Sequence, residues 1–184
     1  MTNMKIEYKL ERNDFIEHQL FAASKSETVI KNLQRSRIKL PLVYFVLGLV
    51  FFVLSDTISA LIFIGIGIAW HFLFPLYLKR KYLKLFEKLI DEHYKNRFGK
   101  QISLNFGEEY IDIISYMGES KLKTNEITAV NENSNYFFIN LSSGESLIIP
   151  KTIINQDSEF NDWVTSLVKK LNINHTIDLN WKWR

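Results

Sequence analysis

The chain has 184 residues, a mean hydropathy close to zero and no cysteine. The absence of cysteine excludes disulfides, zinc–thiolate sites and thiol catalysis. Its formal net charge of +3 is unevenly distributed. Eight basic and five acidic side chains give residues 1–39 a charge of +3, and eight against three give residues 79–100 a charge of +5. Residues 101–184 carry seven basic and eleven acidic side chains, a charge of −4.

One block, residues 40–78, is almost purely apolar, and its single formal charge is Asp56. A single helix over this block would be about 58 Å long, nearly twice the ~30 Å hydrocarbon thickness of a bilayer. Two antiparallel helices that turn at residues 55–57 fit instead. We therefore predict a transmembrane hairpin with spans at about residues 40–55 and 58–78, the first of them short.

A buried hairpin and a cleaved signal peptide fit this block less well. A hairpin buried inside a soluble protein would need more covering surface than the remaining residues provide. A cleaved signal peptide would begin nearer the N-terminus and end in a small-residue cleavage site. Basic residues crowd both outer ends of the block and are absent from the turn, so the positive-inside rule places both termini in the cytoplasm. We expect a multi-pass protein of the plasma membrane.

Three residues within the block, two glycines and a histidine, are candidates for a role in helix packing or function. Gly48 and Gly65 lie at similar distances from Asp56, so they either bring the two helices close together or are unremarkable membrane-helix glycines. His71 is an ionisable group inside a span, where such groups are functional candidates. A proton relay needs a second group at matching depth, and none is visible. We interpret His71 as a neutral side chain near the interface or between the helices.

The segments on either side of the apolar block are expected to be cytoplasmic. Residues 1–39 are expected to form a strand and a helix, and residues 79–99 an amphipathic helix that continues the second span and stops at Gly99. From residue 101 the apolar period changes to two, which predicts about six short antiparallel strands. Asp157 or Ser158 is then placed to cap a helix that reaches residue 171. Fold class is thus α+β: a two-helix hairpin plus a small antiparallel β-barrel or sandwich capped by a C-terminal helix.

The cytoplasmic segments also carry a family resemblance. The stretch ISLNFGEEYIDIISYMGESKLKTNEITAVNENSNYFFINLSSGESLIIPKTI, which ends just after Lys151, resembles the C-terminal domain of YcxB-like proteins. The segment IEYKLERNDFIEHQLFAASKSETVIK, from Ile6, and the two apolar runs are similar to the layout of that family. The resemblance implies a bacterial membrane protein whose cytoplasmic domain, residues 101–171, is a pleckstrin-homology-like barrel. It carries over no functional residues, and residues 172–184 form a tail outside it.

Catalytic and nucleic-acid functions lack support in the sequence. The four histidines are scattered, with no metal-ligand spacing, and the seven glycines form no phosphate-binding loop. Asp91, Glu92 and His93 are consecutive, so on a helix they point about 100° apart and cannot form one site unaided. The acidic C-terminal region argues against nucleic-acid binding. We expect no enzyme activity, no cofactor and no metal.

Lipid contact is the best-supported chemistry. Basic clusters beside a membrane attract anionic lipids at about 1 kcal/mol per residue. We therefore predict anionic-lipid contacts for the six residues that flank the hairpin: Arg35, Arg37, Lys39, Lys79, Arg80 and Lys81. Lys121, Lys123 and Lys151 are candidate anion contacts on the β domain, although the turn at residues 107–109 is acidic. The tail tryptophans at 181 and 183 are either interfacial, part of a final strand, or a frayed end.

The sequence predicts a general class of function but no specific activity. The leading hypothesis is a membrane-anchored cytoplasmic interaction module, in which the hairpin contacts the bilayer and the β domain binds a protein partner near the inner membrane surface. The alternative is an anionic-lipid-sensing domain.

Overall fold

The computed structural model describes residues 4–154 and 158–183. The chain divides into two compact units: one comprises Met1–His18 and Ile90–Lys182, the other Gln19–Leu89 with Trp183–Arg184. The helices are α1 (Arg12–Lys25), α2 (Glu27–Val53), α3 (Thr57–His93) and α4 (Ser158–Leu171). The strands are β1 (Met4–Lys9), β2 (Gln101–Phe106), β3 (Tyr110–Ser115), β4 (Gly118–Lys123), β5 (Ile127–Glu132), β6 (Tyr136–Leu141), β7 (Ser146–Pro150) and β8 (Asn174–Ile177).

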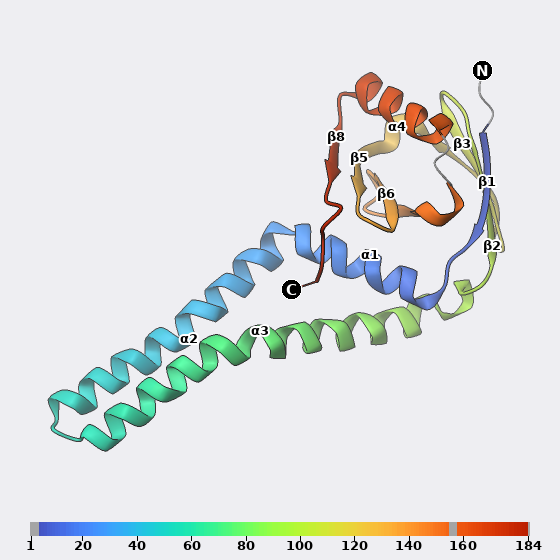
Figure 1. Ribbon diagram of the computed structural model, residues 1–184. Helices are drawn as coiled ribbons and strands as arrows, with labels where there is room; N and C mark the ends of the chain where they lie inside the picture. The colour runs from blue at the N-terminus through green and yellow to red at the C-terminus, as the bar shows by residue number, and fades with distance from the viewer. Residues whose placement is uncertain (1–3, 155–157, 184) are drawn as a thin grey trace. The chain divides into compact units, whose positions relative to one another are not determined.

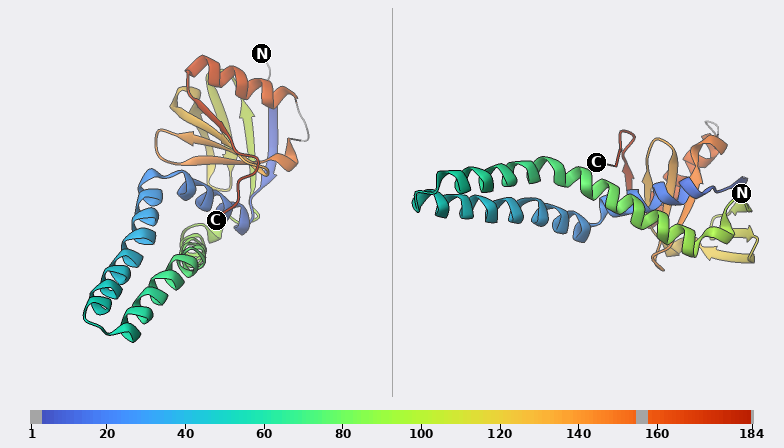
Figure 2. Two further views of the ribbon diagram at one scale, coloured as in Figure 1. Left: turned by 60° about the vertical axis from the view of Figure 1, so that its left-hand side comes forward. Right: turned by 90° about the horizontal axis from the view of Figure 1, so that it is seen from below.

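Helices α2 and α3 form the predicted hairpin (Figures 1 and 2). The turn between them is tight because Ser55 adopts a left-handed backbone with φ of 63°. Asp56 then caps α3: its carboxylate accepts hydrogen bonds from the Ser59 amide at 3.1 Å and the Ser59 hydroxyl at 2.7 Å. Both helices are long and apolar enough to cross a membrane.

Close packing in the hairpin involves Gly48 but not Gly65, so of the two interpretations left open for these glycines, close approach of the helices holds for Gly48 only. A Cβ on Gly48 would lie 2.8 Å from Cγ1 of Ile64 and 3.2 Å from the carbonyl oxygen of Ala60. Nothing lies within 4 Å of the corresponding position on Gly65. Equal distance from the turn does not place two residues on facing sides of their helices, because each residue rotates the helix by about 100°.

The first sheet has the order β1-β2-β3-β4 and is antiparallel throughout. All six residues of β1 pair with β2, from Met4 opposite Phe106 to Lys9 opposite Gln101. The strand pairs span both long helices, so the hairpin is inserted between two neighbouring strands of one sheet. In β1, buried and exposed residues alternate, as expected for a strand with one face on a core.

The second sheet has the order β7-β6-β5-β8. Strand β8, which lies in the predicted tail, pairs in parallel with β5 and places His175 opposite Val130. The described residues thus contain six strands, β2 to β7, in the segment where about six were expected, β1 in the N-terminal segment where a strand was expected, and β8, whose pairing is parallel.

The predicted barrel is not closed. The strands expected in a barrel or sandwich form two separate four-stranded sheets, and no strand of one sheet pairs with a strand of the other among the described residues. A 3₁₀ turn at Thr124–Glu126 separates β4 from β5. The Thr124 hydroxyl donates to the carbonyl oxygens of Glu108 and Glu109 at 3.1 and 3.2 Å, and this fixes the turn against the β2–β3 connection.

The C-terminal helix α4 joins the two sheets through an aromatic core. Phe160 is fully buried and contacts Phe106 of the first sheet at 5.5 Å between ring centroids and Phe137 of the second at 5.1 Å. The Trp163 indole donates to the Gly107 carbonyl at 3.3 Å. The predicted helix is thus present and covers both sheets (Figure 2, left). Its predicted Asp157 cap lies outside the described residues.

Helix α3 continues beyond the apolar block, as predicted, but it ends at His93 rather than at Gly99. A 3₁₀ turn at Lys95–Arg97 follows, and Gly99 has a positive φ of 65°. At this exit Arg12 makes two hydrogen bonds to the Asp91 carboxylate, 2.6 and 2.8 Å long, and Gly99 donates to the Leu10 carbonyl at 2.9 Å. These contacts hold the start of α1 against the segment that leads into β2.

Candidate functional site

The six predicted lipid contacts form two exposed groups on the long helices. Arg35 and Lys39 are four residues apart on one face of α2, while Arg37 points to the opposite side. Lys79, Arg80 and Lys81 are consecutive on α3 and fan out around it. At 1.5 Å per residue, Lys39 lies about 21 Å from the end of α2 at the turn, and Lys79 about 33 Å from the start of α3. The two groups surround their helices at different heights and do not form one pocket.

His71, the ionisable residue of the hairpin, has an exposed side chain. Its ring contacts Phe72 edge-on at 5.6 Å between centroids. Among the described residues it has no ion pair.

The three candidate anion contacts on the β domain do not converge. Lys121 and Lys123 lie on β4, whereas Lys151 begins the 3₁₀ turn after β7 in the other sheet. The Lys151 ammonium lies 2.6 Å from Oε1 of Glu132 and 5.0 Å from the centroid of the Phe137 ring. Because its charge is already neutralised by a partly buried carboxylate, Lys151 is poorly placed to bind an external anion.

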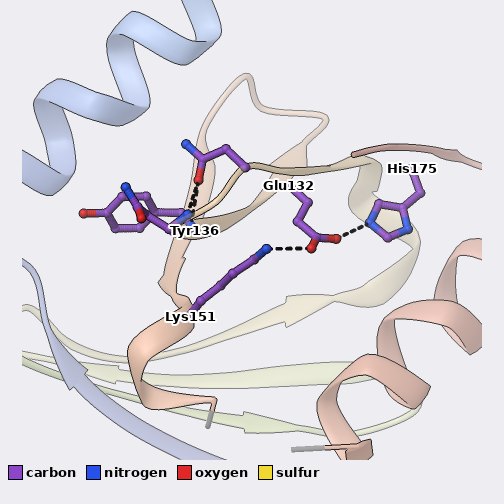
Figure 3. A network of polar contacts seen from close by, with 6 residues as sticks. Glu132, Tyr136, Lys151 and His175 are labelled. Carbon is purple, nitrogen blue, oxygen red and sulfur yellow. Dashed lines mark hydrogen bonds and ion pairs between the residues drawn. The ribbon is translucent and has the colours of Figure 1, made fainter. Parts of the chain in front are cut away.

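Glu132 is the centre of a polar network that the sequence did not reveal (Figure 3). Its second oxygen, Oε2, lies 3.3 Å from Nε2 of His175, and its side chain is only 14% exposed. The two groups are in close contact, but His175 Nε2 makes no hydrogen bond there. The cluster connects β5, β8 and the turn after β7.

The same network continues into the β5–β6 turn. The fully buried Asn133 side chain accepts hydrogen bonds from the backbone amides of Asn135 at 2.8 Å and Tyr136 at 2.7 Å. Its Nδ2 donates to Oε1 of Glu17 on α1 at 2.9 Å. The Tyr136 hydroxyl donates to Asp14 at 2.6 Å. Burial, and secondly the hydrogen bond to Asp14, raise the pKa of Tyr136 far above its ordinary value.

His18 is also part of this α1 interface. Its ring lies 5.2 Å from the ring of Phe138, and burial lowers its pKa from 6.5 to about 4. His18 is therefore neutral at physiological pH. The sequence had given no signal for this role, because a lone histidine among charged residues resembles a solvated helix face.

The contacts of this network are those of a structural element that holds several segments together. Its carboxylates, Asp14, Glu17 and Glu132, each have a donor on another element. No group of three or more histidine, aspartate or glutamate side chains that converges for a metal is found among residues 4–154 and 158–183. The arrangement holds α1, β8 and the turn after β7 against the β5–β6 pair.

Residues 106–164 match the model of the YcxB-like protein family, so the chain carries a YcxB-like domain over this range. The match covers β3 to β7 and the first half of α4 and leaves out β1, β8 and both long helices. No curated protein and no solved structure matches the chain.

Proposed function

We propose that the chain is an integral membrane protein whose hairpin anchors a small α+β domain, and that this domain is a protein-interaction module. The exposed apolar surface of the hairpin supports the proposal that it is a membrane anchor. The apolar windows of α2 and α3 are only 11% and 17% buried, although they consist of large aliphatic and aromatic residues. Apolar surface on this scale requires lipid or protein to cover it.

The charges support an orientation with both termini in the cytoplasm. All six flanking basic residues are exposed and lie toward the ends of the helices remote from the turn. At the turn, the only charged side chain is Asp56, and its carboxylate caps α3. Positively charged loops are retained in the cytoplasm, so the turn is the translocated end.

Protein binding is favoured over lipid sensing by the arrangement of the lysines on the domain. Lys151 is paired with Glu132 in the turn after β7, whereas Lys121 and Lys123 lie on β4 of the other sheet, so the three lysines do not converge. A headgroup site needs several cations free to converge on one phosphate. The six basic residues that flank the hairpin are also exposed, and on the hairpin helices they serve anchoring and orientation.

The membrane topology is testable because the chain has no cysteine of its own. Single cysteines are introduced by Ser55→Cys at the turn and by Ser143→Cys in the β6–β7 hairpin. In intact cells a membrane-impermeant maleimide is expected to label position 55 and not position 143, and lysis is expected to expose both. Labelling of position 143 alone in intact cells would show that the turn is cytoplasmic and that the proposed orientation is wrong.

The interaction is tested by gentle purification of the tagged chain from its native membrane. A stoichiometric protein partner is expected to copurify in several mild detergents; a clean monomer in all of them contradicts the module. The lipid-sensing alternative is tested in nanodiscs of phosphatidylcholine alone or with phosphatidylglycerol. If anionic lipid protects the β-domain amides from hydrogen exchange, and a variant with all six flanking basic residues changed to glutamine retains that protection, the domain itself senses lipid.

A further inference from the structure

Strand β4 is an open edge of the first sheet. It pairs with β3 on one side only, and Leu122 is its single residue that is not fully exposed. An end strand presents a row of backbone N–H and C=O groups without partners, which is a template for another extended chain. The whole six-residue length of β4 is available in this way.

The other three end strands are less suitable. In β1 half of the residues are buried, and the strand contacts the 3₁₀ turn at Lys151–Ile153. Strand β7 ends in Pro150, which has no amide hydrogen to donate. Strand β8 has only four residues. The long, exposed and proline-free edge is therefore that of β4.

Exposed apolar side chains gather on the same hairpin. Four large ones in β3 and the β3–β4 turn are between 41% and 69% exposed: Tyr110, Ile114, Tyr116 and Met117. Ile114 also lines a groove of about 710 Å³ on this sheet, together with Asp112 and Lys121. Oδ1 of Asp112 in the groove is buried, accepts no hydrogen bond and lies 3.4 Å from the Lys121 ammonium. An apolar group beside an open strand edge is typical of a peptide-binding surface.

The charges of β4 indicate what kind of strand fits. Glu119, Lys121 and Lys123 alternate along one face of the strand, because successive side chains point to opposite faces. Lys121 is 73% exposed in its contact with Asp112, and no ion pair is found for Lys123 among the described residues. An antiparallel neighbour with carboxylates opposite the two lysines, and a cation opposite Glu119, complements this row.

We infer that β4 is the docking edge for an extended, predominantly acidic segment of the protein partner, which adds a fifth strand to the first sheet with the pattern acid-x-acid-x-base. The inference rests on the proposed interaction function and names its surface and the chemistry of its partner. The main-chain hydrogen bonds of the added strand supply affinity, and the alternating charges fix its direction and register.

The test uses the full chain in nanodiscs and two fluorescein-labelled peptides, TETETKT and its charge-inverted counterpart TKTKTET. The first peptide is expected to bind about tenfold more tightly, because three cross-strand pairs change from attractive to repulsive in the second. The triple variant Glu119→Lys, Lys121→Glu, Lys123→Glu should reverse this preference. Lys9→Glu, an exposed lysine on β1 of the same sheet, is the matched control and should leave it unchanged.

Strand addition is separated from simple charge attraction by N-methylation. Alternate amides of an added strand point toward β4, so methylation of either the threonines or the charged residues should abolish binding, while methylation of the other set should not. Absence of TETETKT binding at millimolar concentration, or equal binding of both methylated peptides, overturns the inference. A chain that dimerises in sedimentation experiments, and no longer does so as the triple variant, assigns the edge to a second copy and also overturns it.

These outcomes differ from those that test the proposed function. If a partner copurifies equally with the wild-type chain and the triple variant, the interaction module stands and β4 is not its surface. If TETETKT binds but the maleimide labels positions 55 and 143 alike in intact cells, β4 is still the docking edge, and the proposed membrane anchoring is wrong.

Discussion

Ile6 lies opposite Leu104 in the first sheet, although both apolar helices separate them in the sequence. The domain that a membrane hairpin would anchor is therefore not appended to the hairpin but surrounds it in the sequence. Because Leu104 is fully buried and Ile6 nearly so, this pair belongs to the core. Closing the sheet requires the two ends of the hairpin segment to meet, and the contacts of Arg12 with Asp91 fasten them together.

The contribution of β1 can be measured by Ile6→Ala. Removing a buried isoleucine side chain is expected to lower the free energy of unfolding by about 2–4 kcal/mol. Glu7→Ala, on the exposed face of the same strand, is the control and should change it by less than about 0.5 kcal/mol. Urea denaturation of the full chain in micelles measures both, followed by the fluorescence of Trp163 after Trp70, Trp181 and Trp183 have been changed to phenylalanine. Equal effects of the two substitutions would mean that β1 is not part of the cooperative unit.

The β5–β6 turn depends on a single buried amide. Asn133→Ala leaves two backbone N–H groups and the Glu17 carboxylate without their partner, and we expect a loss of about 2–4 kcal/mol. Asn135→Ala removes only exposed contacts with Glu17 and should cost less than about 1 kcal/mol. The same denaturation experiment compares them. A smaller effect at 133 than at 135 would contradict the assigned role of the buried amide.

His18 makes the stability of the β domain pH-dependent. The unfolded-state pKa is near 6.5 and the folded-state pKa is about 4, so the unfolded state binds the proton first as the pH falls. The neutral, buried ring therefore stabilises the fold fully above pH 6.5, and this contribution is lost progressively as the pH falls to about 4. The loss amounts to at most about 3 kcal/mol, because one pKa unit corresponds to about 1.4 kcal/mol and the ring is not wholly shielded.

The measurement is an NMR titration of His18 together with urea denaturation at several pH values. We expect a midpoint near 4 and a flattened stability profile between pH 4 and 6.5 in His18→Gln. A titration midpoint near 6.5 in the folded protein would show that the ring is hydrated. Phe138→Ala serves as a second variant, because opening the site should raise the midpoint toward its ordinary value.

Lys151 is expected to act on stability rather than on anion binding. Lys151→Met leaves Glu132, only 14% exposed, without its 2.6 Å partner, and should lower the free energy of unfolding by about 1–3 kcal/mol. Lys123→Met on exposed β4 should be nearly neutral. Denaturation with and without Glu132→Gln tests the pairing, since the neutral amide should restore most of the loss. An undiminished loss in the double variant would place the role of Lys151 elsewhere.

The parts of the fold that could be predicted from the sequence are those with local signals. Uninterrupted apolar length indicated two helices, and period-two alternation indicated β2 to β7. Strand β8 could not be predicted, because NHTI is too short and too polar to show a period and is held by pairing with β5. The division into two unclosed sheets could not be predicted either, because it depends on which strands pair over long distances in the sequence.

The polar network could not be predicted for a related reason. Asn133 sits in an NENSN run that resembles a solvated turn, and Glu17 is one of several acids on a charged helix. Only the approach of α1 to the β5–β6 turn makes these side chains partners, and that approach depends on β1 pairing with β2. The six basic residues that flank the hairpin could be named as candidate lipid contacts from their positions in the sequence alone. Their different distances from the turn could not, because these depend on where each helix begins and ends.

Gly48 provides the sharpest test of the hairpin, with Gly65 as its control. Gly48→Leu forces a side chain against Ile64 and, more severely, against the Ala60 backbone carbonyl 3.2 Å from the new Cβ, so the helices must separate. Gly65→Leu enters open space and should keep the hairpin intact, with a small gain in helix propensity of about 0.5–1 kcal/mol. Spin labels at positions 51 and 63, where two phenylalanine rings stack 5.2 Å apart, report the separation by electron paramagnetic resonance. We expect a longer distance and faster proteolysis only for Gly48→Leu. Equal behaviour of the two variants would mean that lipid, rather than contact between α2 and α3, sets the spacing of the helices.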